Sequence, residues 1–160
     1  MQNNEVLALG LGKGNLQLAV NVTDLGDGYF RYDYALMNHD FDQGLDGFSI
    51  PLPAGVSVRS TSFRDIDQDG ANDWTAAIAS DSVTWTMPNA TSFQPWGVVF
   101  NFSLEANTAP LVANAIMDVV GRYRPETLEI STRAPSPLPT DIFSDGFESG
   151  DVSSWSSSSP

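Results

Sequence analysis

Residues 16–23 read LQLAVNVT, and residues 30–36, a short turn later, read FRYDYAL. In both stretches apolar and polar side chains alternate, which is the pattern of a β-strand that buries one of its faces. Between them, Leu25-Gly26-Asp27-Gly28 supplies glycines for the backbone conformations that tight turns require. The two stretches therefore predict an antiparallel hairpin, with Leu18 and Tyr34 among its core residues.

The alternation continues to residue 132 and predicts further short strands at 48–52, 56–63, 74–79, 83–87, 98–104, 114–120 and 127–132. Pro51 has no backbone N–H, so we expect the strand that holds it to lie at a sheet edge. The segment from Leu111 to Val120 also fits a helix, but β-forming residues end it and Pro110 precedes it, so we interpret it as mainly strand. Eight or nine short strands separated by turn signals predict an all-β fold, an antiparallel β-sandwich or jelly roll.

The composition divides the chain into four parts. We predict an N-terminal extension at 1–14, a β-sandwich domain at 15–133, a proline-rich linker at 134–139, and an acidic, serine-rich tail at 140–160. The tail also carries apolar residues that a solubility tail does not need, and two interpretations stay open: these residues contact a neighbouring copy of the chain, or the tail folds back on its own domain. These candidate assembly residues are Ile142, Phe143, Phe147, Val152 and Trp155.

The charge balance excludes several functions. The chain of 160 residues has seven Lys and Arg residues against 20 Asp and Glu residues, for a formal net charge of −13. Such a surface repels phosphate backbones and anionic membranes, so we expect no nucleic-acid partner and no membrane insertion. The sequence has no cysteine, which excludes disulfides and thiolate zinc sites. With one histidine and one lysine, few groups are available for acid–base or nucleophilic catalysis, and we expect no enzyme activity.

Residues 65–74 read DIDQDGANDW and carry the clearest chemistry in the sequence. Three aspartates alternate, a glycine permits a sharp turn, and a fourth aspartate follows. Ca²⁺ prefers about six to eight oxygen ligands from carboxylates, backbone carbonyls and water. We therefore predict a Ca²⁺ loop at 65–73, with the ligands Asp65, Asp67, Asp69, the backbone carbonyl of Ala71, and Asp73. Repulsion between the carboxylates favours an ordered loop when a divalent cation offsets it.

This D-x-D-x-D-G-x-x-D pattern resembles the calcium loops of FG-GAP propeller repeats and of thrombospondin type 3 repeats. Those families carry many copies and this chain has one, so the resemblance implies the ligand roles and not the fold. A second acidic stretch, at 40–47, has spacing too loose for a metal cage, and we interpret it as a solvated loop.

The aromatic residues divide into core candidates and one candidate for ligand binding. Most of them, including Trp74 and Trp85, fall at alternating positions among Phe and Val, which favours burial. Trp96 instead follows Pro95 in a loop. Because an exposed indole can stack on sugar rings, we assign Trp96 as the candidate glycan-binding residue.

Several stretches resemble a little-characterised family of secreted bacterial β-domains, namely 29–38 (YFRYDYALMN), 48–56 (FSIPLPAGV), 72–75 (NDWT) and 96–102 (WGVVFNF). This resemblance implies an extracellular sandwich with no established activity. Residues 143–156 resemble a C-terminal tag found on many secreted bacterial proteins, which implies export or surface display. Together with the acidic composition, these resemblances favour an extracellular or bacterial cell-surface location.

Two hypotheses for function follow. The first is a non-enzymatic, calcium-stabilised extracellular sandwich that assembles with copies of itself into a surface layer or fibre, with a terminal segment adding a strand to a neighbour's sheet. The alternative is a carbohydrate-binding or adhesion module of a secreted bacterial protein.

Overall fold

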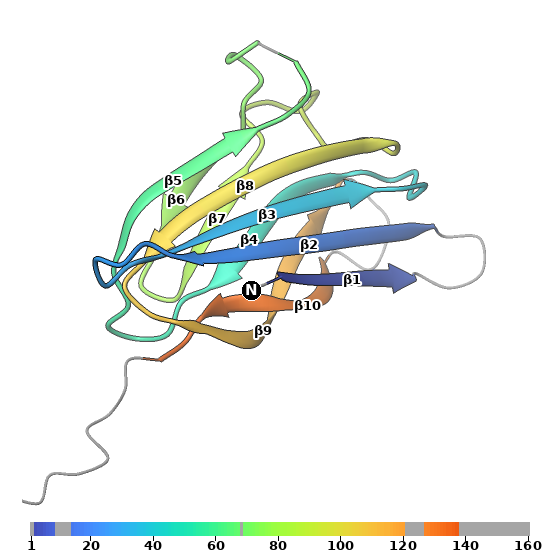
Figure 1. Ribbon diagram of the computed structural model, residues 1–160. Helices are drawn as coiled ribbons and strands as arrows, with labels where there is room; N and C mark the ends of the chain where they lie inside the picture. Colours follow the sequence, from blue (N-terminus) through green and yellow to red (C-terminus); the bar gives the residue numbers. More distant parts are fainter. Residues whose placement is uncertain (1, 9–13, 68, 121–126, 138–160) are drawn as a thin grey trace, which may run out of the picture.

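The computed structural model of the protein describes residues 2–8, 14–67, 69–120 and 127–137, and within them ten β-strands form two sheets (Figure 1). Sheet A has the strand order β1 (Gln2–Ala8), β2 (Asn15–Asp24), β3 (Phe30–Asn38), β8 (Val98–Ala106) and β5 (Val58–Arg64). Sheet B has the order β10 (Thr127–Pro135), β9 (Pro110–Val119), β4 (Leu45–Pro51), β7 (Ser82–Thr86) and β6 (Thr75–Ile78). All the pairings are antiparallel and the sheets pack face to face, so the predicted all-β sandwich is confirmed. No helix in these residues is long and apolar enough to cross a membrane.

Alternating burial along the strands builds the core between the sheets. In β2, Leu18 and Val20 are buried, while Ala19 and Asn21, which alternate with them, lie on the outer face of sheet A. The register places Leu18 opposite Leu36 and Val20 opposite Tyr34 of β3, and these two partners are buried as well. The predicted hairpin and its core face are therefore confirmed.

An aromatic cluster joins the two sheets. Phe48 of β4 and Trp85 of β7 belong to sheet B, whereas Tyr34 of β3 and Phe102 of β8 belong to sheet A, and all four side chains are fully or almost fully buried. The ring centroids are 4.5 Å apart for Phe48 and Phe102, 5.4 Å for Trp85 and Phe102, and 5.8 Å for Tyr34 and Phe48. Aromatic pairs at such distances contribute about 0.5–1.5 kcal/mol each beyond the burial of apolar area.

The structure corrects the predicted position of the strand that holds Pro51. We expected an edge strand, but β4 lies in the middle of sheet B, between β9 and β7. The pairing with β9 ends at Ser49, whereas Pro51 pairs only with Ser82 of β7. The next residue, Leu52, donates its N–H to Asp81 on the β7 side. Since successive backbone N–H groups alternate sides, the nitrogen of Pro51 faces the side where pairing has ended, and no ladder hydrogen bond is lost.

The structure also places more of the chain in the sheets than we expected. Residues 2–8, which we assigned to the N-terminal extension, form β1 and pair with β2 of the same chain. At the other end, β10 runs to Pro135, opposite Pro110 of β9, so the predicted linker at 134–139 begins inside the last strand. Ala134 is fully buried, and this packing overrides the proline-rich composition that suggested a linker.

Gly47 and Asp118 are packed together on the outer face of sheet B, beside a β-bulge in β4. A Cβ atom on Gly47 would clash with the carboxylate of Asp118, so glycine leaves the room that this side chain needs. Partial burial, with a smaller contribution from the charge of Asp46, raises the pKa of Asp118. A carboxyl group whose pKa is higher in the folded protein than in the unfolded chain reduces stability at neutral pH.

We therefore expect Asp118→Asn to raise the free energy of unfolding at pH 7 by a few tenths of a kcal/mol, because asparagine keeps the shape and removes a charge that solvent only partly screens. The gain should disappear as the pH falls below the ordinary pKa of an aspartate, where Asp118 is protonated in both states. Urea unfolding at several pH values measures the difference. The control is Asp42→Asn at an exposed loop carboxylate, and an equal gain in both variants would contradict the prediction.

Candidate functional site

The acidic loop, residues 65–73, connects the end of β5 in sheet A to β6 in sheet B (Figure 1). Its local shape comes from a repeated hydrogen bond. The Oδ1 atoms of Asp65, Asp67 and Asp69 accept the backbone N–H groups of Asp67, Asp69 and Ala71 at 3.1, 2.7 and 3.1 Å. Each of these aspartates closes a turn over the residue that follows it, and the spacing of two residues lets one turn lead into the next.

The carboxylates of the loop influence one another electrostatically. Partial burial, together with the charges of Asp67 and Asp73, raises the pKa of Asp65. The side chain of Asn72, whose Nδ2 donates to Asp67 Oδ2 at 3.0 Å, holds the pKa of Asp67 below its usual value, as does the N–H of Asp69. An added positive charge near Asp65 would favour its ionised form, against both its burial and the neighbouring carboxylates.

The structure does not gather the predicted calcium ligands into one cage. Among the described residues, no three His, Cys, Asp or Glu side chains converge closely enough to hold a metal ion. The donor chemistry nevertheless fits Ca²⁺, because the loop presents carboxylate oxygens together with the Oδ1 atom of Asn72, which is buried and has no hydrogen-bond partner. Calcium binding at Asp65, Asp67, Asp69, Ala71 and Asp73 stays a prediction.

Trp74 anchors the end of the acidic loop to the core. Its side chain is almost fully buried and stacks on Phe63, with ring centroids 6.1 Å apart and planes 6° apart. Its indole N–H donates a hydrogen bond of 2.6 Å to the backbone carbonyl of Ser92, which lies in the β7–β8 loop, residues 87–97. The two loops are thus held side by side, and a pocket of about 190 Å³ lies between them, lined in part by Asp65, Asp67, Asn72, Thr91, Ser92 and Pro95.

A buried glutamine fixes the β7–β8 loop. Gln94 has no exposed surface, and its backbone N–H and C=O both bond to the backbone of Leu45, at 2.8 and 3.1 Å. Its side-chain Nε2 donates to the carbonyls of Leu36 in β3 and Val98 in β8, at 2.6 and 3.0 Å. A buried amide that joins several strands in this way leaves the loop little freedom.

Trp96 is presented to solvent just after this anchor. Its side chain is 66% exposed, in contrast to the buried Trp74 and Trp85, so the predicted exposure of Trp96 and burial of the other two agree with the structure. The following residue, Gly97, has φ of +78° and donates its N–H to the carbonyl of Asn38 at 2.6 Å. Gly97 adopts this left-handed conformation without strain, so the exposed indole is held between two fixed points, Gln94 and Gly97.

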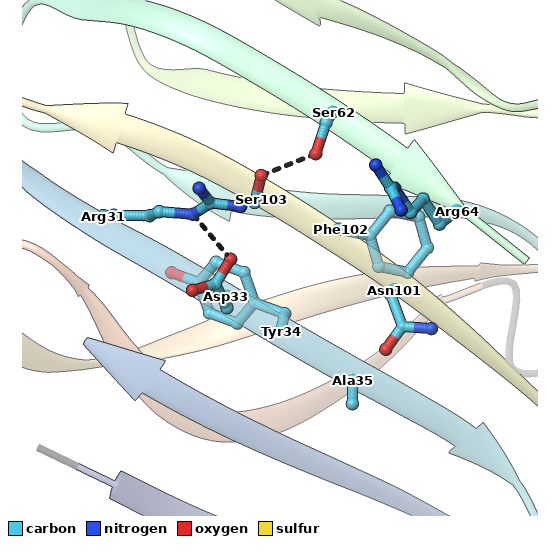
Figure 2. A pocket seen from close by; sticks show the side chains of 9 residues that line it. All are labelled: Arg31, Asp33, Tyr34, Ala35, Ser62, Arg64, Asn101, Phe102 and Ser103. Atoms are coloured by element: carbon cyan, nitrogen blue, oxygen red, sulfur yellow. Dashed lines mark hydrogen bonds and ion pairs between the residues drawn. The ribbon is translucent and has the colours of Figure 1, made fainter. Parts of the chain in front are cut away.

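A second concave region, which we call the sheet A groove, lies on the outer face of sheet A (Figure 2). Its volume is about 190 Å³, and its side-chain lining includes Arg31, Asp33, Ala35, Ser62, Arg64, Asn101 and Ser103. The register brings these residues together across three strands, in the rows Ala35–Asn101–Arg64 and Asp33–Ser103–Ser62. Small side chains in the middle leave the hollow, and the hydroxyls of Ser62 and Ser103 bond to each other at 2.6 Å.

Arginine side chains gather around this groove. Three of the four arginines in the described residues, Arg31, Arg59 and Arg64, belong to β3 and β5 of sheet A. Arg31 pairs with Asp33 at 2.9 Å, and Arg59, which lies outside the groove lining, pairs with Asp27 at 2.6 Å and Glu105 at 2.7 Å. Within the described part of the chain, Arg64 has no ion pair, so its charge is available to a ligand.

Sequence reasoning missed the sheet A groove, because its residues come from strands far apart in the sequence, and only the strand order β3-β8-β5 makes them neighbours. The alternating pattern within each strand predicts which side chains face outward, but it does not predict which strands are neighbours in the sheet. The candidate assembly residues Ile142, Phe143, Phe147, Val152 and Trp155 lie outside the described residues, and their role stays a prediction.

Comparisons with known proteins add little. No protein-family model matches the chain, and no curated protein matches it. One similar solved structure is the crystal structure of a GH20 exo-β-N-acetylglucosaminidase from Vibrio harveyi in complex with N-acetylglucosamine, with a TM-score of 0.45 and 14% sequence identity. The match covers 78% of this chain and 19% of that protein, so this chain spans about a fifth of its length. The family resemblances found in the sequence stay predictions.

Proposed function

We propose that the protein is a non-enzymatic, calcium-stabilised extracellular module that binds glycans through Trp96. The observation that carries the proposal is the contrast among the described tryptophans, since Trp74 and Trp85 are buried and Trp96 is 66% exposed. An exposed indole leaves a large apolar surface in water, which is favourable when a ligand covers it. The apolar C–H face of a sugar ring is a suitable cover, because the ring hydroxyls at its edge stay solvated.

The fixed loop supports this role. Gln94 and Gly97 hold the segment on both sides of Trp96 before any ligand arrives, so little conformational entropy would be lost on binding. A binding residue on a loop that is itself locked by buried hydrogen bonds is positioned precisely.

Calcium would act on this site from the acidic loop. Asp65, Asp67, Asp69 and Asp73, with the carbonyl of Ala71, would hold the ion, which would cancel their repulsion and cross-link the loop. The hydrogen bond from Trp74 to Ser92 connects the end of the acidic loop to the loop that carries Trp96. The ion would thus stabilise both loops.

Trp96→Ala should weaken binding to a polysaccharide at least tenfold, because the stacking surface is lost while the fold is kept. Affinity electrophoresis and pull-down on cellulose, chitin and xylan measure it. Val112→Ala is the matched control, since Val112 is also exposed but lies on β9 of sheet B. Unchanged binding by Trp96→Ala, or no binding of the wild type to any glycan in a broad panel, would refute the proposal.

Calcium at about 10 mM should raise the melting temperature by roughly 5–10 °C if its dissociation constant is about 0.1 mM, within the range of extracellular modules. The double variant Asp67→Asn, Asp69→Asn should lose this response, since two ligand charges are removed. Differential scanning calorimetry with calcium and with a chelator measures it. Asp42→Asn, Asp81→Asn removes the same charge elsewhere and should keep the response. A calcium response in the first double variant would count against the acidic loop as the site.

Self-assembly is a second candidate function, favoured by the open edge of sheet B. β6 pairs only with β7, and all four of its side chains are exposed. The strand Thr75–Ile78 contains no proline or lysine, the residues that commonly block an edge against an added strand. A segment of a neighbouring copy could therefore pair with β6.

Ile78→Pro tests this edge. Ala79 donates its N–H toward β7, so the N–H of Ile78 faces away from it, and proline there removes a donor from the free edge while sparing the β6–β7 ladder. We expect the wild type to form concentration-dependent assemblies in sedimentation velocity and negative-stain images, and the variant to form fewer. A wild type that stays monomeric up to high concentration would rule out this function.

A further inference from the structure

The sheet A groove has the chemistry of a binding site that does not involve Trp96. We propose that it binds acidic glycans, in which Arg64 recognises a sugar carboxylate while Asp33, Asn101 and the serine hydroxyls of the groove bind ring hydroxyls. This inference goes beyond the proposed function, since it names a different site and a ligand class.

Charge complementarity is the first argument. The whole chain has a formal net charge of −13, yet the groove is lined by two arginines and one acidic residue. The guanidinium of Arg31 is already paired with Asp33, whereas Arg64 has no ion pair among the described residues. A planar guanidinium can bind a carboxylate through two parallel hydrogen bonds, so Arg64 is the group in the groove that is best suited to a carboxylate ligand.

The strand order argues against an extended peptide as the ligand. The groove lies over β3, β8 and β5; β3 and β8 each pair with a neighbour on both sides, whereas β5 is the edge strand of sheet A. A strand added to β5 would extend sheet A beyond the groove and would not fill it, so the strand addition by which many domains bind peptides would leave the groove uncovered. Recognition at this face must come from side chains.

The side chains present suit a polyhydroxylated ligand. Asp33 accepts hydrogen bonds, Asn101 can both donate and accept, and the hydroxyls of Ser62 and Ser103 can do either. A sugar ring carries hydroxyls that match such mixed groups, whereas an acidic peptide offers Asp33 few hydroxyl donors. Figure 2 shows Arg64 and Asn101 toward one end of the groove and Asp33 toward the other.

The dimensions indicate a ligand that lies along the face. Arg31 and Ala35 are four residues apart on β3, which corresponds to roughly 13 Å. The volume of about 190 Å³ is below the roughly 300–1,000 Å³ of pockets that enclose small molecules. A shallow site of this length suits a short stretch of a polysaccharide better than an enclosed monosaccharide.

Isothermal titration with short oligogalacturonates, in a calcium-free buffer, tests the inference. We expect the wild type to bind them, and Arg64→Gln to bind at least tenfold more weakly. Oligosaccharides of the same length with their carboxyl groups reduced to alcohols should also bind the wild type at least tenfold more weakly. Thermal melting confirms that each variant is folded.

Arg59→Gln is the matched control. It removes the same charge from the same sheet, but from a guanidinium that Asp27 and Glu105 already engage, so binding should change by less than about threefold. An equal loss in both variants would indicate diffuse attraction and overturn the site. So would unchanged binding by Arg64→Gln, equal binding of polyglutamate, or no binding of oligogalacturonate to the folded wild type. Trp96→Ala should leave this binding intact, so the proposal for the groove and the proposal for Trp96 are tested independently.

Discussion

The packing of aromatic rings between the sheets is the contact on which the rest of the molecule depends. Phe48 and Phe102 meet near the centre of the sandwich, and Phe63 continues the cluster from Phe102, at a centroid distance of 5.4 Å, toward Trp74. Trp74 then bonds to the β7–β8 loop. A continuous series of packed rings therefore runs from the middle of the core to the loops at one end. The position of those loops depends on the packing of these rings.

Features that depend on neighbouring residues could be predicted from the sequence, and features that depend on strand order could not. The alternation around Leu18 and Tyr34 predicted the hairpin, and the position of Trp96 after Pro95 predicted its exposure, because both are local properties. The prediction for Pro51 was wrong, since it treated the whole strand as an edge when only the last residues of β4 lack a neighbour. The sheet A groove needed the pairing of β8 with both β3 and β5, which no local pattern encodes.

The two candidate binding regions are held in place by different means. Buried polar groups hold the β7–β8 loop, where Gln94 bonds to Leu36 and Leu45, both distant in sequence, and to nearby Val98 at the start of β8. Regular strand pairing holds the sheet A groove, so its side chains stand on a backbone that is already rigid. In the acidic loop, by contrast, most of the observed hydrogen bonds are local. In each of them an aspartate side chain accepts the backbone N–H of the residue two positions later. This is the region whose order would gain most from a bound ion.

The uneven distribution of arginine would also affect how a negatively charged polysaccharide reaches the protein. From a distance such a polymer meets the repulsion of a chain with a formal net charge of −13, and only at close range does it meet Arg64 and Arg31. The screening length is about 30 Å at 0.01 M ionic strength and about 8 Å at 0.15 M. Moderate salt would therefore screen the long-range repulsion from the whole chain before it screens the short-range attraction to the arginines of the groove. Encounter rates would rise with ionic strength and then fall, whereas a uniformly basic surface would show only the fall.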